Sequence, residues 1–165
     1  MVNNQVQFSL LDRRPLLEMQ EYCVQNQIGI TPFGVVAGGF LTNKYLGVEP
    51  GQVAVDTSSK SKYASVLNQV GGYQWYQDLL QVLNLVADKH QQTVANVATR
   101  WVLQQPAVPA VIIGARTANH VADHQALFTV HNTCHLTTPT LQLLLLVTCA
   151  AKCDLLLQLL VFTAV

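Results

Sequence analysis

The chain has 165 residues, of which 50% are apolar and only 11% are charged, and its nine basic side chains equal its nine acidic ones. An intrinsically disordered chain needs low hydrophobicity or a large net charge, so this composition excludes one. The lack of a basic excess also argues against nucleic-acid binding. The length suits one domain with a hydrophobic core.

The first third of the chain predicts a strand, a helix and a second strand. Apolar and polar residues alternate over 4–10, which is the periodicity of a strand. A turn with a proline at Pro15 then starts a short helix over 16–24. Residues 28–33 form a second apolar run and lead directly into a glycine-rich segment, 34–39.

The middle of the chain predicts a long loop and two helices. Residues 47–61 are rich in Gly, Pro, Ser and Thr and indicate a surface loop. Helical stripes of apolar residues follow over 75–90 and 94–102, and Thr93 is placed to cap the second helix.

A short β-branched run at 111–115 predicts a strand buried on both faces, and Thr117 is placed to cap a last helix. Strands that alternate with helices predict an α/β fold with a parallel sheet, and periodicity alone leaves open whether the sheet closes into a barrel.

The end of the chain differs from the rest. Residues 141–165 are dense in leucine, with Lys152 and Asp154 near the centre. A membrane span would carry both charges at a cost of about 3 kcal/mol each, so we predict no span and expect a helix that needs cover from other parts of a protein.

The cysteines and the N-terminus bear on the compartment. Cys23, Cys134, Cys149 and Cys153 form no C-x-x-C pair, and we interpret them as reduced thiols. Residues 1–11 have neither a basic start nor a long apolar run, so they predict no signal peptide and favour an intracellular, cytoplasmic location.

Three places in the sequence are candidates for a binding site. Glycines in 34–39 allow close approach of a pyrophosphate, although the spacing is not G-x-G-x-x-G and also fits a tight turn. In 111–117 a strand ends in Gly114, Arg116 and a helix N-terminus, which suits an anion and equally an ordinary turn. His120 and His124 lie one helical turn apart, but without an accompanying carboxylate set we predict no metal site.

Taken together, several segments resemble the C-terminal half of an aldo/keto reductase. The resemblance rests on Asn4-Gln5-Val6-Gln7-Phe8-Ser9-Leu10-Leu11-Asp12-Arg13-Arg14, Pro32-Phe33 to Gly47, Arg100-Trp101-Val102-Leu103 and Val111 to Arg116, in the family's order and spacing. The Ser-Leu-Leu-Asp-Arg-Arg stretch is similar to the branch that includes potassium-channel β subunits. The resemblance divides the chain into residues 1–130, part of an NADP-dependent reductase domain, and a divergent tail, 131–165.

The resemblance implies a partial (β/α)8 barrel with about three parallel strands, because a complete barrel takes about 250 residues. It also implies an NADPH site. Gln5 matches the glutamine that bonds the nicotinamide carboxamide, and Phe33 matches the aromatic residue that stacks on the nicotinamide ring. The remaining residues that the resemblance assigns to the cofactor are, along the pyrophosphate, Gly34, Val36 and Gly39 and, around the adenosine half, Gly114, Ala115, Arg116, His120, Asp123 and His124.

The resemblance implies carbonyl reduction of an aldehyde or ketone by hydride transfer, but the family's catalytic residues lie on strands that we do not find here. None of the five tyrosines sits in the family's tyrosine motif, so we assign no catalytic residue and expect this chain alone to be inactive. The alternative is a non-catalytic nucleotide-binding subunit that resembles the channel β subunits. An open sheet edge and the leucine-rich tail favour self-association.

Overall fold

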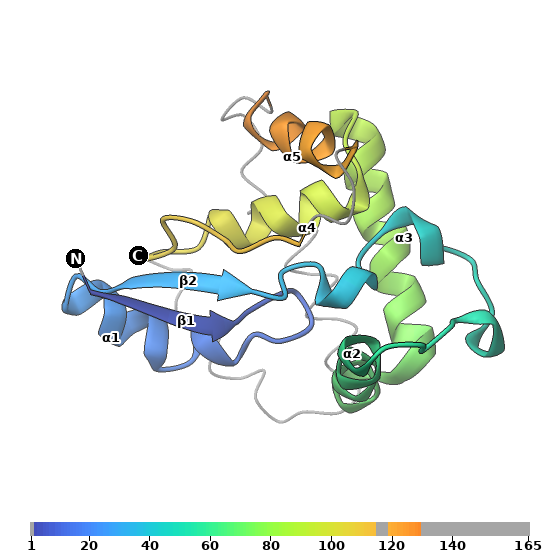
Figure 1. The fold of residues 1–165 in the computed structure, drawn as a ribbon, viewed down its shortest axis with the longest axis horizontal. Coiled ribbons are helices and arrows are strands. Elements are labelled where there is room, and N and C mark those ends of the chain that lie inside the picture. Colours follow the sequence, from blue (N-terminus) through green and yellow to red (C-terminus); the bar gives the residue numbers. More distant parts are fainter. Residues whose placement is uncertain (1, 115–118, 130–165) are drawn as a thin grey trace, which may run out of the picture. The chain divides into compact units, whose positions relative to one another are not determined.

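The sheet consists of two parallel strands, β1 (Asn3–Gln7) and β2 (Gly29–Phe33), as Figure 1 shows. We describe them from a computed structural model, in which residues 2–114 and 119–129 are described. The register sets Asn3 beside Gly29 and Gln7 beside Phe33. Alternation over 4–10 predicted β1 and the apolar run over 28–33 predicted β2, and the parallel α/β arrangement is confirmed.

Helix α1 (Met19–Gln25) connects the two strands and follows a short 3-10 turn that contains Pro15. Proline lacks an N–H and fixes φ near the helical value, so it suits the start of such a turn. Cys23 on α1 is buried at 2% exposure and points into the core, as expected for a reduced thiol. The strand–helix–strand order predicted for this part of the chain is confirmed.

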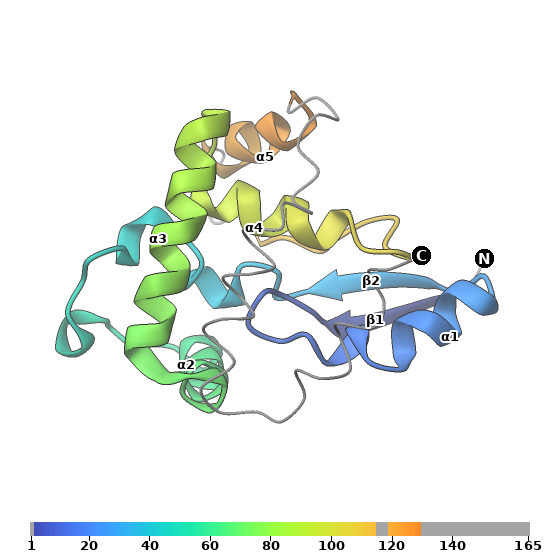
Figure 2. The ribbon, with the colours of Figure 1, turned by 180° about the vertical axis from the view of Figure 1, so that it is seen from behind.

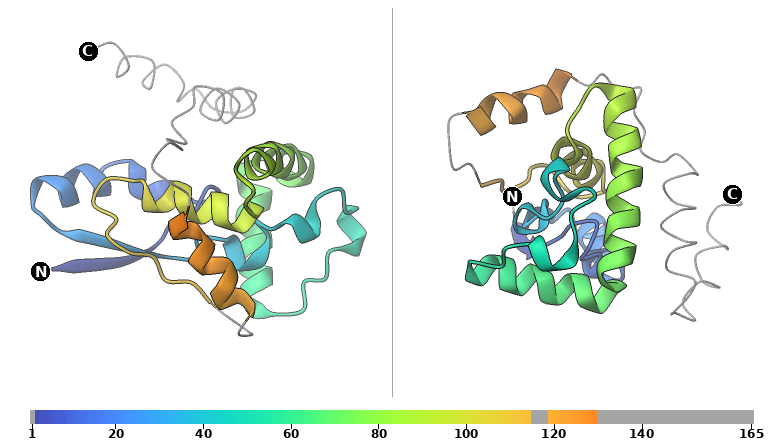
Figure 3. Two further views of the ribbon diagram at one scale, coloured as in Figure 1. Left: turned by 90° about the horizontal axis from the view of Figure 1, so that it is seen from above. Right: turned by 90° about the vertical axis from the view of Figure 1, so that its right-hand side faces the viewer.

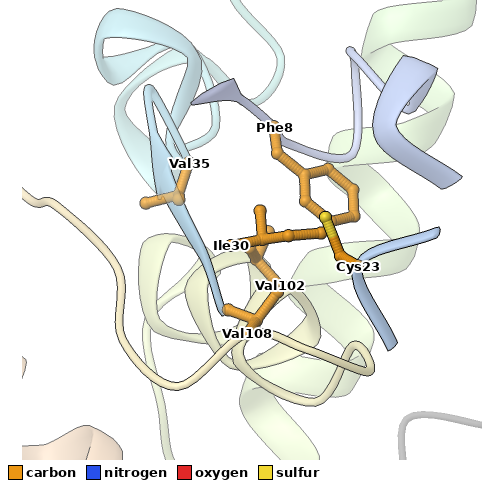
Figure 4. Packing of buried hydrophobic residues seen from close by; sticks show 6 residues of the cluster. All are labelled: Phe8, Cys23, Ile30, Val35, Val102 and Val108. Carbon is orange, nitrogen blue, oxygen red and sulfur yellow. The ribbon is translucent and has the colours of Figure 1, made fainter. Parts of the chain in front are cut away.

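The hydrophobic core lies between β2, α1 and a later helix, α4 (Val94–Leu103), and Figure 4 shows its side chains. Phe8 packs edge-on against Trp101 with 5.7 Å between ring centroids. Each large side chain buried in this way stabilises the fold by about 1.5–3 kcal/mol. The buried members of the cluster are Phe8, Cys23, Ile30, Val35, Val102 and Val108.

The third strand, which we predicted over 111–115, is shorter than expected. Within the described residues it is reduced to one parallel bridge between Ile112 and Phe33, with the Ile112 N–H donating to the Pro32 carbonyl at 2.7 Å. A strand buried on both faces needs other elements packed against each face. Ile112 is 43% exposed, so within the described residues one face of this segment is not packed in this way. Two strands and a bridge replace the three strands that we expected.

Helix α2 (Ser58–Val70) begins inside the segment that we predicted as loop, 47–61. The Thr57 hydroxyl accepts a hydrogen bond from the Lys60 N–H and caps the helix. Tyr63 and Leu67, one turn apart, form its buried face. The first turn of α2 is polar, so the sequence shows no clear helical pattern there. The helix forms because burial of one face outweighs intrinsic helix propensity.

The remaining helices agree with the apolar stripes in the sequence. Helix α3 (Gly72–His90) leads into α4, which contacts α5 (Asn119–Thr129). Figure 2 shows α2 at one end of α3, and Figure 3 shows α3 alongside the strands and α4. The Thr93 hydroxyl accepts from the Asn96 N–H at 3.1 Å, which confirms the predicted cap of α4.

Two predictions concern residues outside the described part of the chain, the Thr117 cap and the leucine-rich tail over 131–165. Among the helices of residues 2–114 and 119–129, none combines the length and the apolar character that crossing a membrane requires.

Candidate functional site

The end of the sheet formed by the last residues of β1 and β2 brings three of the predicted segments together. Gln5 on β1 lies beside Thr31, two residues before Phe33 on the neighbouring strand. Phe33 in turn bridges Ile112, so Gly114 follows only two residues after a point of contact with β2. Gln5 and Gly114 are exposed and Phe33 is half-buried. In parallel sheets this carboxyl edge is where ligands bind.

The glycine-rich loop after β2 is a tight turn in the structure. Gly34 and Gly38 have φ angles of +69° and +63°, a region that other residues rarely adopt. The Ala37 N–H donates to the Gly34 carbonyl at 2.8 Å, and the Gly39 N–H donates to the Val36 carbonyl at 2.9 Å. These donors therefore serve the turn itself. Val36 is half-buried and packs on the hydrophobic core.

Two side chains of α2 lie against this region, although the sequence gave no reason to expect them there. The Tyr63 ring packs on the backbone of Gly34 and Gly38. The Lys62 ammonium lies 5.5 Å from the centroid of the Phe33 ring and 5.5 Å from that of Tyr63. A cation over an aromatic face is attracted by the ring quadrupole. Phe33, Gly34 and Gly38 are thus in contact with the first half of α2.

A charged cluster follows β1 at the same end of the sheet. The Gln7 amide donates to the Asp12 carboxylate at 2.7 Å, and the Arg14 guanidinium donates to both Asp12 oxygens at 2.7 and 2.6 Å. Burial would raise the pKa of Asp12, but the hydrogen bonds and charge of Arg14 and the bond from Gln7 outweigh it and lower that pKa. Burial and the charge of Asp12 together raise the pKa of Tyr63.

The candidates for the adenosine half are only partly described. Ala115, Arg116 and the side chain of His120 lie outside the described residues. Asp123 is exposed, and its backbone carbonyl accepts from the Asn96 amide at 2.8 Å, which ties α5 to α4. Both ring nitrogens of His124 are buried and have no hydrogen-bond partner in the described part of the chain. The meeting of these residues with Gly114 around one ligand stays a prediction.

The residues that we missed from the sequence are Lys62 and Tyr63. The available signals were Thr57 as a helix cap and the spacing of Tyr63 and Leu67, which is one helical turn. Both residues can be recognised only once helix α2 is predicted, and our prediction of a loop over 47–61 concealed them. Nothing in the sequence alone would have paired Tyr63 with two glycines more than twenty residues earlier.

Comparison with known families decides what this arrangement belongs to. The family model described as "Aldo/keto reductase family" matches residues 1–133, which includes β1, β2 and the helices α1 to α5. The chain belongs to the aldo/keto reductase family. A curated protein, flagellar radial spoke protein 5 of Chlamydomonas reinhardtii, is 33% identical over 112 residues, covering 65% of this aldo/keto reductase chain and 21% of that protein.

Solved aldo-keto reductase structures share the fold. The thermostable aldo-keto reductase Tm1743, crystallised with the inhibitor epalrestat, has a TM-score of 0.56 at 17% identity over 87% of this chain and 39% of its own. The glycerol dehydrogenase AKR11B4 of Gluconobacter oxydans has a TM-score of 0.60 at 22% identity over 76% of this chain and 37% of its own. This chain therefore spans about a fifth of the curated relative and less than two fifths of these structures.

Proposed function

We propose that residues 1–130 form the NADP(H)-binding part of a partial (β/α)8 barrel, in an oxidoreductase family that reduces aldehydes and ketones. The observation that carries the proposal is the register of the sheet, which sets Gln5 and Phe33 on neighbouring strands near the same edge. Membership of the aldo/keto reductase family supports an oxidoreductase-like function for the complete fold. The residue roles below follow from the family resemblance and from the exposure of each group.

The residues at the sheet edge fit a nicotinamide nucleotide in part. Gln5 is exposed, and its amide offers both a donor and an acceptor to a carboxamide. Phe33 is half-buried and offers an aromatic face for stacking. A Cβ placed on Gly39 or Gly114 would meet nothing within 4 Å, so the backbone is open to close approach there. When bound, NADPH supplies the hydride.

Two of the described tyrosines, Tyr73 and Tyr76, do not suit the role of proton donor to a carbonyl. The Tyr76 hydroxyl is buried and donates to the Phe40 carbonyl, and burial raises its pKa. The Tyr73 hydroxyl donates to the Val48 carbonyl, and burial raises its pKa as well. A raised pKa makes a phenol a weaker acid, and both protons are already engaged. We therefore assign neither of these two tyrosines the role of proton donor.

The test is titration of the purified chain with NADPH, followed by nucleotide fluorescence, with an aldehyde-reduction assay beside it. We expect saturable binding, no turnover, and weaker binding in Phe33→Ala and Gln5→Ala. Loss of an aromatic contact of about 1 kcal/mol corresponds to roughly fivefold in affinity. Gln69→Ala, on the exposed side of α2, is the matched control and should bind like the wild type. A folded chain that binds no NADPH contradicts the proposal, and turnover contradicts the lack of a catalytic group.

A second candidate is a non-catalytic, nucleotide-responsive subunit similar to the potassium-channel β subunits. The 33%-identical relative is named for a radial spoke of the flagellum, which favours a part in a larger assembly. A sensor needs different affinities for NADPH and NADP⁺, because a ligand shifts an equilibrium only by its differential affinity. A tenfold or larger difference between the two titrations supports the sensor, and equal affinities count against it.

Two further proposals concern the setting of the chain. An intracellular, cytoplasmic location is supported by the buried free thiol of Cys23. Self-association is supported by the two-stranded sheet, because such a small sheet leaves an edge for pairing with another chain. Concentration-dependent sedimentation tests the second of these.

A further inference from the structure

The glycine-rich loop already has an occupant in this structure, and the occupant is a side chain of the same protein. Tyr63 is only 5% exposed, and its ring lies on Gly34 and Gly38. A Cβ placed on Gly38 would lie 2.6 Å from Tyr63 Cδ2, and one placed on Gly34 would lie 2.9 Å from Cζ and overlap the hydroxyl. Real Cβ atoms essentially never approach so closely, so only glycine allows the ring to lie there.

The contact is confined to one side of the loop. The neighbouring Gly39 has a positive φ of +95°, but a Cβ there would meet nothing within 4 Å. Gly39 is therefore required by its backbone conformation, whereas Gly34 and Gly38 are required by both conformation and the Tyr63 ring. The Tyr63 ring therefore lies against Gly34 and Gly38, while Gly39 stays open to close approach and Gly38 keeps exposed surface.

The residues beside Tyr63 extend this cover. Lys62 places its ammonium over the Phe33 ring at 5.5 Å from the centroid. Ser59, one turn earlier, has its hydroxyl 3.3 Å from where a Cβ of Gly38 would lie. The first half of α2 thus lies over Phe33, Gly34 and Gly38, of which Phe33 and Gly34 also belong to the proposed nucleotide site.

We propose that Tyr63 is a gate on the nucleotide site, whose ring must leave Gly34 and Gly38 before a dinucleotide can lie along the loop. This inference rests on the proposed NADP(H)-binding function. If only a fraction of the molecules is open, the apparent affinity for the nucleotide is the intrinsic affinity multiplied by that fraction. Removal of the Tyr63 ring should therefore raise the apparent affinity. Tyr63 acts here as a positioning residue of the free protein and is assigned no chemical step.

The chain just before α2 is exposed to solvent over residues 54–57. Lys60 forms an ion pair with the exposed Asp56 at 2.7 Å. Leu67, one turn after Tyr63, is buried at 3%. A movement of the first turns alone would uncover the loop.

The experiment compares NADPH titrations of the full chain and three variants, each shown to be folded by a cooperative thermal transition. Tyr63→Ala removes the ring, and Tyr63→Phe removes only the hydroxyl that overlaps the Cβ position of Gly34. Leu67→Ala is the matched control, because it removes a similarly buried side chain from the same helix without uncovering the loop. We expect Tyr63→Ala to bind at least fivefold tighter than the wild type, Tyr63→Phe at least twofold tighter, and Leu67→Ala within twofold.

Each other outcome has a definite meaning. If the wild type binds NADPH and Tyr63→Ala binds equally or more weakly, the gate is wrong, while the proposed function stands. If no folded variant binds NADPH, both the gate and the proposed function are wrong. If Tyr63→Ala does not fold, Tyr63→Phe decides, and an affinity no higher than that of the wild type overturns the gate.

Discussion

Replacement of Asp12 by asparagine is the most direct test of the cluster beside the candidate site. Asp12 is 5% exposed and accepts from the Gln7 amide at 2.7 Å and from Arg14 through both carboxylate oxygens. Asparagine keeps the shape of aspartate but offers only one acceptor oxygen. Its NH2 group would face an N–H donor of Gln7 or Arg14, where aspartate has its second oxygen. The change therefore removes the charge with little change in side-chain volume.

The expected loss is dominated by the buried side of the cluster. A hydrogen bond to a charged group contributes about 1.5–3 kcal/mol. The Arg14 side chain is 78% exposed, so its ion pair adds only about 0–1 kcal/mol. We expect Asp12→Asn to lower the free energy of unfolding by about 2–3 kcal/mol at pH 7 and Arg14→Gln by less than about 1 kcal/mol.

The pH dependence provides a second, independent check. The folded-state pKa of Asp12 is lowered from its ordinary value of 3.8, so the unfolded chain takes up a proton at a higher pH than the folded one. The stabilisation is fully present above pH 3.8 and is lost as the pH falls through the folded-state pKa. The gap in stability between wild type and Asp12→Asn should therefore be constant near neutrality and shrink below about pH 4.

The assay is urea unfolding followed by tryptophan fluorescence, at pH 7 and at steps down to the lowest pH at which the wild type stays folded. Arg14→Gln serves as the control, because it removes the exposed partner and leaves the Gln7 bond intact. An Asp12→Asn variant that is as stable as the wild type at pH 7 would refute the reasoning. An equal loss in both variants would assign the stabilisation to the ion pair instead.

Three further substitutions test packing and caps. Gly38→Ala should cost more stability than Gly47→Ala, because both have positive φ but only Gly38 meets Tyr63; equal thermal shifts would contradict this contact. His124→Leu should raise the free energy of unfolding by about 1 kcal/mol or more, because both buried ring nitrogens lack hydrogen-bond partners in the described part of the chain. The control is Gln125→Leu, which changes an exposed side chain and should have little effect. Thr93→Ala should cost about 0.5–2 kcal/mol in chemical denaturation, and an unchanged midpoint would show that the cap contributes nothing.

Periodicity predicted the elements whose pattern and burial agree. The alternation over 4–10 predicted β1 and leads to Phe8 in the core, and the apolar run over 28–33 predicted β2, which places Ile30 there. Helix α4 follows a clear apolar stripe with its cap at Thr93. The strand expected over 111–115 was predicted from apolar character alone. Apolar character indicates that other elements must pack over the strand, but it does not show that they are present. Among residues 2–114 and 119–129, Ile112 is 43% exposed and this segment contributes a single bridge, to Phe33.

The candidate site was predicted in part, and the missing part has a physical reason. The family resemblance grouped Gln5 and Phe33 in one site, and the register of the two parallel strands brings them near one sheet edge. The contribution of α2 could not, since two buried residues among serines and lysines give a weak stripe and the partners of Tyr63 are distant in the chain. Helical stripes identify which face is buried but not what lies against it.

A glycine in a sequence records only that a Cβ is absent, and two different causes produce that absence. One is a positive φ, which Gly39 illustrates, and the other is close approach of another group, which Gly34 and Gly38 illustrate. The family resemblance assigns that approaching group to a pyrophosphate, whereas the structure assigns it to the Tyr63 ring. One surface cannot hold both at once. Both assignments are therefore correct only if they describe alternative states of the loop, and the affinity of Tyr63→Ala for NADPH distinguishes alternation from permanent packing.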